Sequence, residues 1–222
     1  MSGAQDRRPS RTEAPGVGRA AWQLGLRQIL PRLQPDLWVF GYGSLMWDPG
    51  FAYEEAPHAR VFGYHRALCL LSVRNRGTPE RPGLVLAMDR GGSCHGIAFR
   101  IAPSAQGEVL DYLWAREMYT GAYRPVVVPA RLADGRRIAA LAFIARPGHA
   151  QYCRTASPEE AARLVVQGHG SYGRALDYLR NVVRHLDALG ICDGPLHRVL
   201  AISEALDATR GMDRQQETPY GP

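Results

Sequence analysis

Short runs rich in Val, Ile, Leu and aromatic residues fill the middle half of this chain and alternate with turn-forming residues. The runs cover residues 37–42, 60–73, 84–90, 94–101, 125–132 and 137–145. Runs of this length and composition are typical of strands. Asp134-Gly135 and Arg90-Gly91-Gly92-Ser93 have the composition of hairpin turns, so strands that follow one another are expected to pair. Strands joined in this way predict a small, mainly antiparallel or mixed sheet that closes on itself like a barrel.

Helical patterns surround these strands, so the expected fold class is α+β with helices packed around the sheet. Ser157-Pro158-Glu159-Glu160 combines a capping serine, a proline at the first helical position and a glutamate three residues after the cap. This combination predicts the start of a helix. Ser104 is expected to cap another helix, over residues 105–119. Further helices are expected over residues 21–33, 171–189 and 195–208.

The composition indicates one soluble domain with short tails. A chain of 222 residues with 45% hydrophobic and 22% charged residues is long enough to bury a sizeable core. We expect a disordered tail over residues 1–20, a single domain over 21–208 and a second tail over 209–222. No apolar run reaches the roughly 18 residues that a membrane-spanning helix needs. The arginines near the N-terminus are not followed by the apolar segment of a secretory signal.

The positive charge does not indicate a nucleic-acid-binding protein. The net charge is +6, but all 27 basic residues are arginines and they are spread along the whole chain. A phosphate-binding face requires a stripe or a block of such residues. The absence of lysine also excludes Schiff-base chemistry, the usual pyridoxal-phosphate enzymes and a Walker-type phosphate site.

The cysteines and histidines predict neither disulfides nor a metal site. Cys69, Cys94, Cys153 and Cys192 lie far apart, and none of them forms a C-x-x-C pair. This pattern is typical of the reduced thiols of a cytoplasmic protein. The seven histidines have no spacing that would assemble the three or four ligands of a zinc site. We therefore expect no metal and no other cofactor.

The apolar residues 38–40 predict a buried strand, which ends in Gly41-Tyr42-Gly43-Ser44-Leu45. The two glycines allow the backbone to approach a ligand closely. Successive N–H groups in such a turn can converge on an anion such as a carboxylate. Met46 stands where a dinucleotide-binding motif requires glycine, and the residues two positions from Ser44 are not the glycines of a serine-hydrolase elbow. An ordinary strand-to-loop turn remains the alternative.

This turn resembles the Y-G-S-L signature of the γ-glutamylcyclotransferases, most closely that of the glutathione-specific ChaC-type branch and its bacterial members. Three further segments are similar to motifs of the family and come in the same order, over about residues 36–205. They are Arg76-Gly77-Thr78-Pro79 with Arg81-Pro82-Gly83, Trp114-Ala115-Arg116-Glu117-Met118 with Gly121 and Tyr123, and the glycine-rich segment from Gly168 to Leu179. The resemblance implies the small closed-sheet fold of that family.

Glu117 is the candidate catalytic residue. In the expected helix 105–119 it continues an apolar stripe at i, i+3, i+4 and i+7 that includes Leu110 and Leu113. Burial and the C-terminal end of a helix both raise the pKa of a carboxyl group, as a general base working near neutral pH requires. The alternatives are that the helix frays before Glu117, or that Arg116 or Arg124 pairs with it on the surface. The resemblance favours catalysis, because the family's catalytic glutamate follows the arginine of this motif.

The resemblance also implies a reaction and a set of binding residues. The γ-glutamyl group of glutathione would cyclise to 5-oxoproline and release cysteinylglycine. Its binding residues would be Phe40, Gly41, Tyr42, Gly43, Ser44, Leu45 and Tyr123. A cyclotransferase for other γ-glutamyl amino acids or amines, or a non-catalytic γ-glutamyl-binding relative, remains open. Asn75, Tyr172 and Ala175 depart from the family pattern and leave the leaving-group specificity open, and the sequence does not give the oligomeric state.

Overall fold

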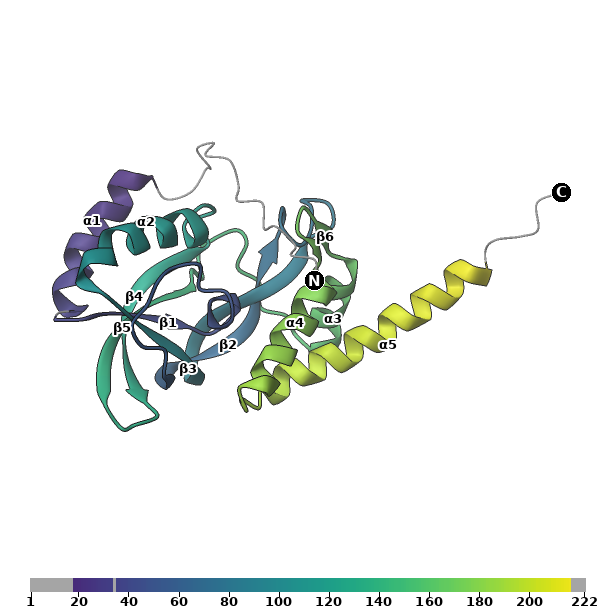
Figure 1. The fold of residues 1–222 in the computed structure, drawn as a ribbon. Helices are drawn as coiled ribbons and strands as arrows, with labels where there is room; N and C mark the ends of the chain where they lie inside the picture. Colours follow the sequence, from purple (N-terminus) through teal and green to yellow (C-terminus); the bar gives the residue numbers. More distant parts are fainter. Residues whose placement is uncertain (1–17, 34, 217–222) are drawn as a thin grey trace, which may run out of the picture.

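The computed structural model describes residues 18–33 and 35–216, and its centre is a closed barrel. The strands are β1 (Leu37–Gly41), β2 (His58–Ser72), β3 (Gly83–Ile101), β4 (Tyr123–Leu132) and β5 (Arg137–Ala145), in the order β1-β3-β2-β4-β5 (Figure 1). Neighbours in this order pair antiparallel. Strand β5 closes the barrel through parallel pairing with β1 and β3. The predicted closed, mixed sheet is confirmed.

Strand β1 is buried on both faces. Val39 lies in a cluster with Phe99 and Leu141, whereas Phe40 lies in a second cluster with Met88. The side chains of a strand alternate between its two faces, so adjacent residues supply different clusters. All five residues of β1 are buried, and the turn that follows the strand therefore begins from a fixed point.

The hairpin predicted at Arg90-Gly91-Gly92-Ser93 is wrong, because β3 continues through these residues. Gly91 and Gly92 have φ angles of 100° and 67°. They lie opposite the single residue Gly63, where the register between β2 and β3 shifts. Two residues facing one define a β-bulge, which bends the strand without reversing it. The turn predicted at Asp134-Gly135 is confirmed, since it joins β4 to β5 and Gly135 has a φ of 91°.

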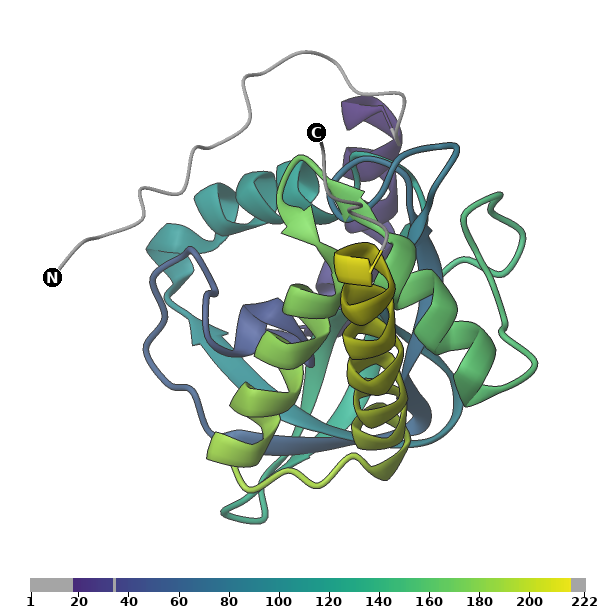
Figure 2. The ribbon, with the colours of Figure 1, turned by 90° about the vertical axis from the view of Figure 1, so that its right-hand side faces the viewer.

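Five α-helices flank the barrel in the part of the chain that the structure describes. They are α1 (Arg19–Ile29), α2 (Gln106–Glu117), α3 (Pro158–Gln167), α4 (Ala175–Ala188) and α5 (Gly194–Gln216). Helices α1 and α2 lie together on one side of the barrel, and α3, α4 and α5 gather on the other (Figure 1). Figure 2 shows α4 and α5 side by side. None of the helices in the described residues is long and apolar enough to cross a membrane.

Short elements connect the larger ones. Three 3₁₀ segments are η1 (Leu30–Leu33), η2 (Ser44–Met46) and η3 (Pro103–Ala105), and the two-residue strands β6 (His169–Gly170) and β7 (Gly173–Arg174) form a small hairpin before α4. The predicted cap of α3 is confirmed, since the Oγ atom of Ser157 accepts a hydrogen bond from the Glu160 N–H at 3.2 Å. The predicted cap at Ser104 is wrong: Pro103 starts η3, and α2 begins only after it, without a side-chain cap.

Several helix boundaries differ from the expected ones. Helix α1 begins at Arg19, inside the expected N-terminal tail, and Pro31 lies in η1. Helix α4 begins at Ala175 because the residues before it form the β6–β7 hairpin. Helix α5 continues to Gln216, through part of the expected C-terminal tail. The rest of the two tails, residues 1–17 and 217–222, lies outside the described residues.

Candidate active site

A small cavity lies where the turn after β1 meets the end of α2. It is lined by Tyr42, Gly43, Ser44, Leu45, Leu86, Glu117, Tyr123, Phe143 and Tyr178. The structure thus brings together Glu117, Tyr123 and the turn from Tyr42 to Leu45. Phe40 and Gly41 are not among the lining residues: Phe40 is fully buried in the core and Gly41 packs against Leu45 and Phe99.

The turn presents its backbone to this cavity. Segment η2 begins immediately after Gly43, and the Met46 N–H donates to the Gly43 carbonyl at 2.9 Å. The N–H groups of Ser44 and Leu45 come before this first hydrogen bond of the 3₁₀ segment. The first N–H groups of a helical segment have no acceptor within it. Both residues line the cavity, so their amides are donors suited to an anionic or carbonyl oxygen.

Glu117 is the last residue of α2, and its carboxylate is largely buried. Its side chain is 16% exposed, and Leu110 and Leu113 of the same stripe are buried as predicted. Burial raises the pKa of Glu117 above the usual value of 4.5. The Arg116 guanidinium opposes this increase, with its Nε atom 3.2 Å from Glu117 Oε1. The carboxyl group therefore has the raised pKa of a general base.

Arg116 connects the base to the turn. Its Nη2 atom donates to Ser44 Oγ at 2.9 Å, and Nη1 donates to the Tyr112 hydroxyl and the Asp48 carbonyl, each at 2.8 Å. The ion pair between Arg116 and Glu117 that the alternative predicted exists, but its predicted surface position is wrong, because the Arg116 side chain is only 20% exposed. Arg116 therefore holds Glu117 and Ser44 in a single hydrogen-bonded unit.

Three tyrosines form the walls of the cavity and remain protonated. The Tyr42 hydroxyl donates to the Phe143 carbonyl at 2.8 Å, and the Tyr123 hydroxyl donates to the Leu86 carbonyl at 2.7 Å. The Tyr178 hydroxyl accepts from the Leu86 N–H at 3.4 Å. Burial raises the pKa of all three phenols, that of Tyr178 to about 12. None of them therefore competes with Glu117 as a base near neutral pH.

Leu86, Phe143 and Tyr178 are lining residues that the sequence did not reveal. They come from β3, β5 and α4, and only the closure of the barrel brings these elements together. For Leu86 and Phe143 no signal in the sequence distinguishes them from other core residues. Tyr178 lies in the segment from Gly168 to Leu179 that resembles the family, and this is the one signal that points to it.

Two of the residues that depart from the family pattern belong to one hydrogen-bonded group with Tyr119. The Asn75 side chain donates to the Tyr119 hydroxyl at 2.8 Å, and the Tyr172 N–H donates to the Asn75 carbonyl at 2.9 Å. Tyr119 follows Glu117 closely in sequence, and the charge of Glu117 contributes to its raised pKa, after burial. Ala175, in contrast, is fully buried at the start of α4. Asn75 and Tyr172 are thus hydrogen-bonded to each other, and Asn75 is also hydrogen-bonded to Tyr119.

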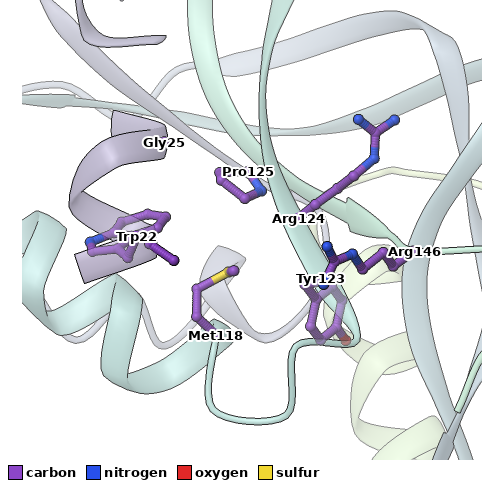
Figure 3. Close-up of a pocket in the computed structure, with 8 residues that line it drawn as sticks. Trp22, Gly25, Met118, Tyr123, Arg124, Pro125 and Arg146 are labelled. Carbon is purple, nitrogen blue, oxygen red and sulfur yellow. The ribbon is translucent and has the colours of Figure 1, made fainter. Parts of the chain in front are cut away.

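A larger cavity lies next to this site and differs from it in chemistry. It measures about 140 Å³, against about 40 Å³ for the cavity at Glu117, and is lined by residues of α1, of β4 and of the segments beside them. Figure 3 shows Trp22 and Met118 close together on one side of it, with Arg124 extending away from them. Tyr123 borders both cavities. No carboxylate lines the larger cavity, so we place the site in the smaller one.

No metal centre is found in the part of the chain that the structure describes. Within it, no group of three or more His, Cys, Asp or Glu side chains is arranged to hold a metal ion. The four cysteines, all of which the structure describes, are free. The polar groups of the residues that line the cavity are the carboxyl of Glu117, the hydroxyl of Ser44, the backbone amides of the turn and the phenols.

The fold is that of the γ-glutamyl cyclotransferases. A yeast γ-glutamyl cyclotransferase specific to glutathione superposes with a TM-score of 0.70 over 77% of this chain and 96% of its own, at 21% identity. The chain belongs to the ChaC-like protein family, whose model matches residues 37–205. The glutathione-specific γ-glutamylcyclotransferase of Escherichia coli K12 is 37% identical over 75% of this chain and 74% of its own length. Glutathione-specific γ-glutamylcyclotransferase 1 of Mus musculus is 32% identical over 84% of this chain and 81% of its own length.

Proposed function

We propose that this protein is a glutathione-specific γ-glutamylcyclotransferase with Glu117 as its general base. The observation that carries the proposal is the buried carboxylate of Glu117, which shares one cavity with the backbone turn at Gly43, Ser44 and Leu45. Glutathione is the substrate named for the relatives from Escherichia coli and Mus musculus. We assign the reaction to the cytoplasm, and the free cysteines support this location.

In the proposed reaction the turn binds the glutamyl group and Glu117 moves the proton. The carboxylate of Glu117 takes a proton from the α-ammonium group of the substrate. The resulting amine attacks the γ-carbonyl carbon, a new C–N bond closes a five-membered ring, and the bond to the cysteinyl nitrogen breaks. Protonated Glu117 returns its proton to that nitrogen, and the second proton of the ring nitrogen then passes through Glu117 to the released amine. The products are 5-oxoproline and cysteinylglycine, and no water is consumed.

The site contributes mainly by holding the substrate in a folded conformation. Well-oriented intramolecular attack can lower the barrier by about 7 kcal/mol or more. Amides of the turn that point at the developing oxyanion stabilise it further. Because Arg116 bridges Glu117 and Ser44, the base and these amides keep a constant separation while the ring closes.

Arg74 is the residue that we assign to the carboxylate of the leaving dipeptide. Arg76 is already engaged, since it donates to the Tyr172 carbonyl and its guanidinium lies 5.5 Å above the Tyr178 ring. The Arg74 side chain is exposed. Its charge lowers the pKa of Tyr119, two residues after Glu117, and it has no ion pair within the described residues. A guanidinium without a partner suits bidentate binding of a carboxylate.

The proposal is tested by incubating the purified protein with glutathione and, separately, with γ-glutamyl amino acids that lack the glycine. Mass spectrometry then measures 5-oxoproline and the released amine. We expect 5-oxoproline and cysteinylglycine in equal amounts from glutathione, and much slower turnover of the shorter compounds. Preferred turnover of the shorter compounds would reassign the substrate. A complete absence of 5-oxoproline would contradict the proposed reaction.

A further inference from the structure

Arg66 is a buried arginine that contacts the turn after β1 but does not line the cavity. It lies on β2, and its side chain is 3% exposed. Its Nε atom donates to the Tyr42 carbonyl at 2.6 Å, and Nη2 donates to the His95 carbonyl at 2.5 Å. Its Nη1 atom forms an ion pair with Asp193 Oδ2 at 2.8 Å. Each of the three guanidinium nitrogens thus has its own acceptor.

Burial of an arginine in this way costs free energy and is not needed for stability alone. Arginine is almost never fully buried unless it is paired, and an apolar residue in its place is often neutral or stabilising. The Arg66–Asp193 pair explains how the charge is tolerated. It does not explain why two backbone carbonyls also point at the guanidinium, and one of them belongs to Tyr42, which lines the cavity.

The contact with Tyr42 fixes a peptide group of the candidate site. In a trans peptide the C=O and the following N–H point in opposite directions. When Arg66 holds the Tyr42 carbonyl, the Gly43 N–H must face away from Arg66. Gly43 lines the cavity together with Glu117, whereas Arg66 does not. Gly43 has no side chain to resist rotation of this peptide, so an outside group is needed to set its orientation.

We propose that Arg66 is a positioning residue that orients the Tyr42–Gly43 peptide so that its N–H donates to the bound γ-glutamyl group. This inference rests on the proposed function of the cavity. Arg66 then completes a three-sided support of the turn. The Tyr42 hydroxyl is held by Phe143, the Ser44 hydroxyl is held by Arg116, and Arg66 holds the peptide between them.

Asp193 provides the matched control, because it contacts Arg66 but not the turn. It precedes α5, where its Oδ1 atom accepts from the Leu196 N–H at 3.3 Å. Asp193→Asn removes the charge opposite Arg66 and leaves the two carbonyl contacts of Arg66 in place. Arg66→Lys keeps the charge, but a single ammonium group cannot reproduce the three directed contacts of the fork. Arg60→Lys alters an exposed arginine of the same strand.

The experiment measures the melting temperature and the kcat/KM for glutathione of the wild type and of these three variants, at a temperature where all are folded. We expect Arg66→Lys to lose between about 10- and 100-fold in kcat/KM, the effect of a displaced binding group. Asp193→Asn is expected to melt at a lower temperature while it keeps kcat/KM within about threefold, and Arg60→Lys is expected to match the wild type. Arg66→Gln replaces Arg66→Lys if the lysine variant does not fold, with the same expected loss.

Two results would overturn the role of Arg66. One is a kcat/KM of the Arg66 variant within about twofold of the wild type. The other is an equal loss in Asp193→Asn, which would assign the effect to the ion pair and not to the Tyr42 carbonyl. A wild type without turnover on any γ-glutamyl compound would overturn the proposed function separately. Glutathione affinity, measured by calorimetry, then replaces kcat/KM, and unchanged affinity in the Arg66 variant counts against the proposal.

Discussion

Removal of the Tyr42 hydroxyl should cost stability but little activity. This hydroxyl donates to the Phe143 carbonyl at 2.8 Å, and the two residues are 7% and 1% exposed. In Tyr42→Phe the carbonyl is left without this donor where water has little access. An unsatisfied buried group costs about 1 to 3 kcal/mol. In a chain of this length each kcal/mol corresponds to about 2 to 4 °C, so we expect the melting temperature to fall by about 2 to 12 °C.

The assay combines thermal unfolding, followed by circular dichroism, with glutathione turnover measured well below both transitions. Tyr53→Phe serves as the control, because Tyr53 is 48% exposed, and its melting temperature should stay within about 1 °C of the wild type. We expect kcat of Tyr42→Phe to stay within about fivefold, since the hydroxyl is engaged with the backbone. An unchanged melting temperature would refute the stability estimate. A loss of kcat above about 100-fold, the size of a lost acid–base group, would make the hydroxyl a catalytic group.

Arg116→Gln removes the charge that lowers the pKa of Glu117, so burial then acts unopposed and the acid limb of the kcat/KM profile should move to higher pH. A limb that stays in place, or moves to lower pH, would contradict Glu117 as the titrating group. Because folding raises the pKa of Glu117, its contribution to stability is complete below the unfolded pKa and is lost as the pH rises through the folded pKa. The free energy of unfolding of the wild type relative to Glu117→Gln should therefore increase as the pH falls from neutral toward 4.5, and urea titrations at several pH values check this trend. Gly96→Ala would place a methyl group 2.2 Å from the Gly41 carbonyl oxygen and should destabilise the protein by about 1 to 3 kcal/mol. Gly107→Ala, in open space on α2, should stabilise it by up to about 1 kcal/mol, and equal melting temperatures of the two variants would argue against the tight packing at Gly96.

Much of the barrel could be predicted because its strands are apolar and bounded by turn residues. The prediction was wrong at Gly91 and Gly92 for a physical reason. Paired glycines supply positive φ angles both to hairpins and to bulges. Only the partner strand decides between the two, and here β2 places a single residue, Gly63, opposite the pair. Local sequence does not contain that register.

The candidate site could be predicted only where its residues are local in sequence. Glu117 follows from a helical stripe, and the turn at Gly43 follows from the end of a strand. Leu86 and Phe143 could not be predicted, because β3 and β5 reach the cavity only when the barrel has closed. The hydrogen bond from Arg66 to the Tyr42 carbonyl could not be predicted for the same reason, since Arg66 lies on β2 and Tyr42 follows β1.

A single substitution, Glu117→Gln, shows whether Glu117 is the base of a cyclisation. Glu117→Gln should bind glutathione with an affinity close to that of the wild type, measured by calorimetry. Its formation of 5-oxoproline should fall by about 10² to 10⁴, the contribution of a general base. Glu108→Gln, an exposed carboxylate on the same helix, should retain full activity. A Glu117→Gln enzyme that forms 5-oxoproline within about tenfold of the wild-type rate would contradict the account.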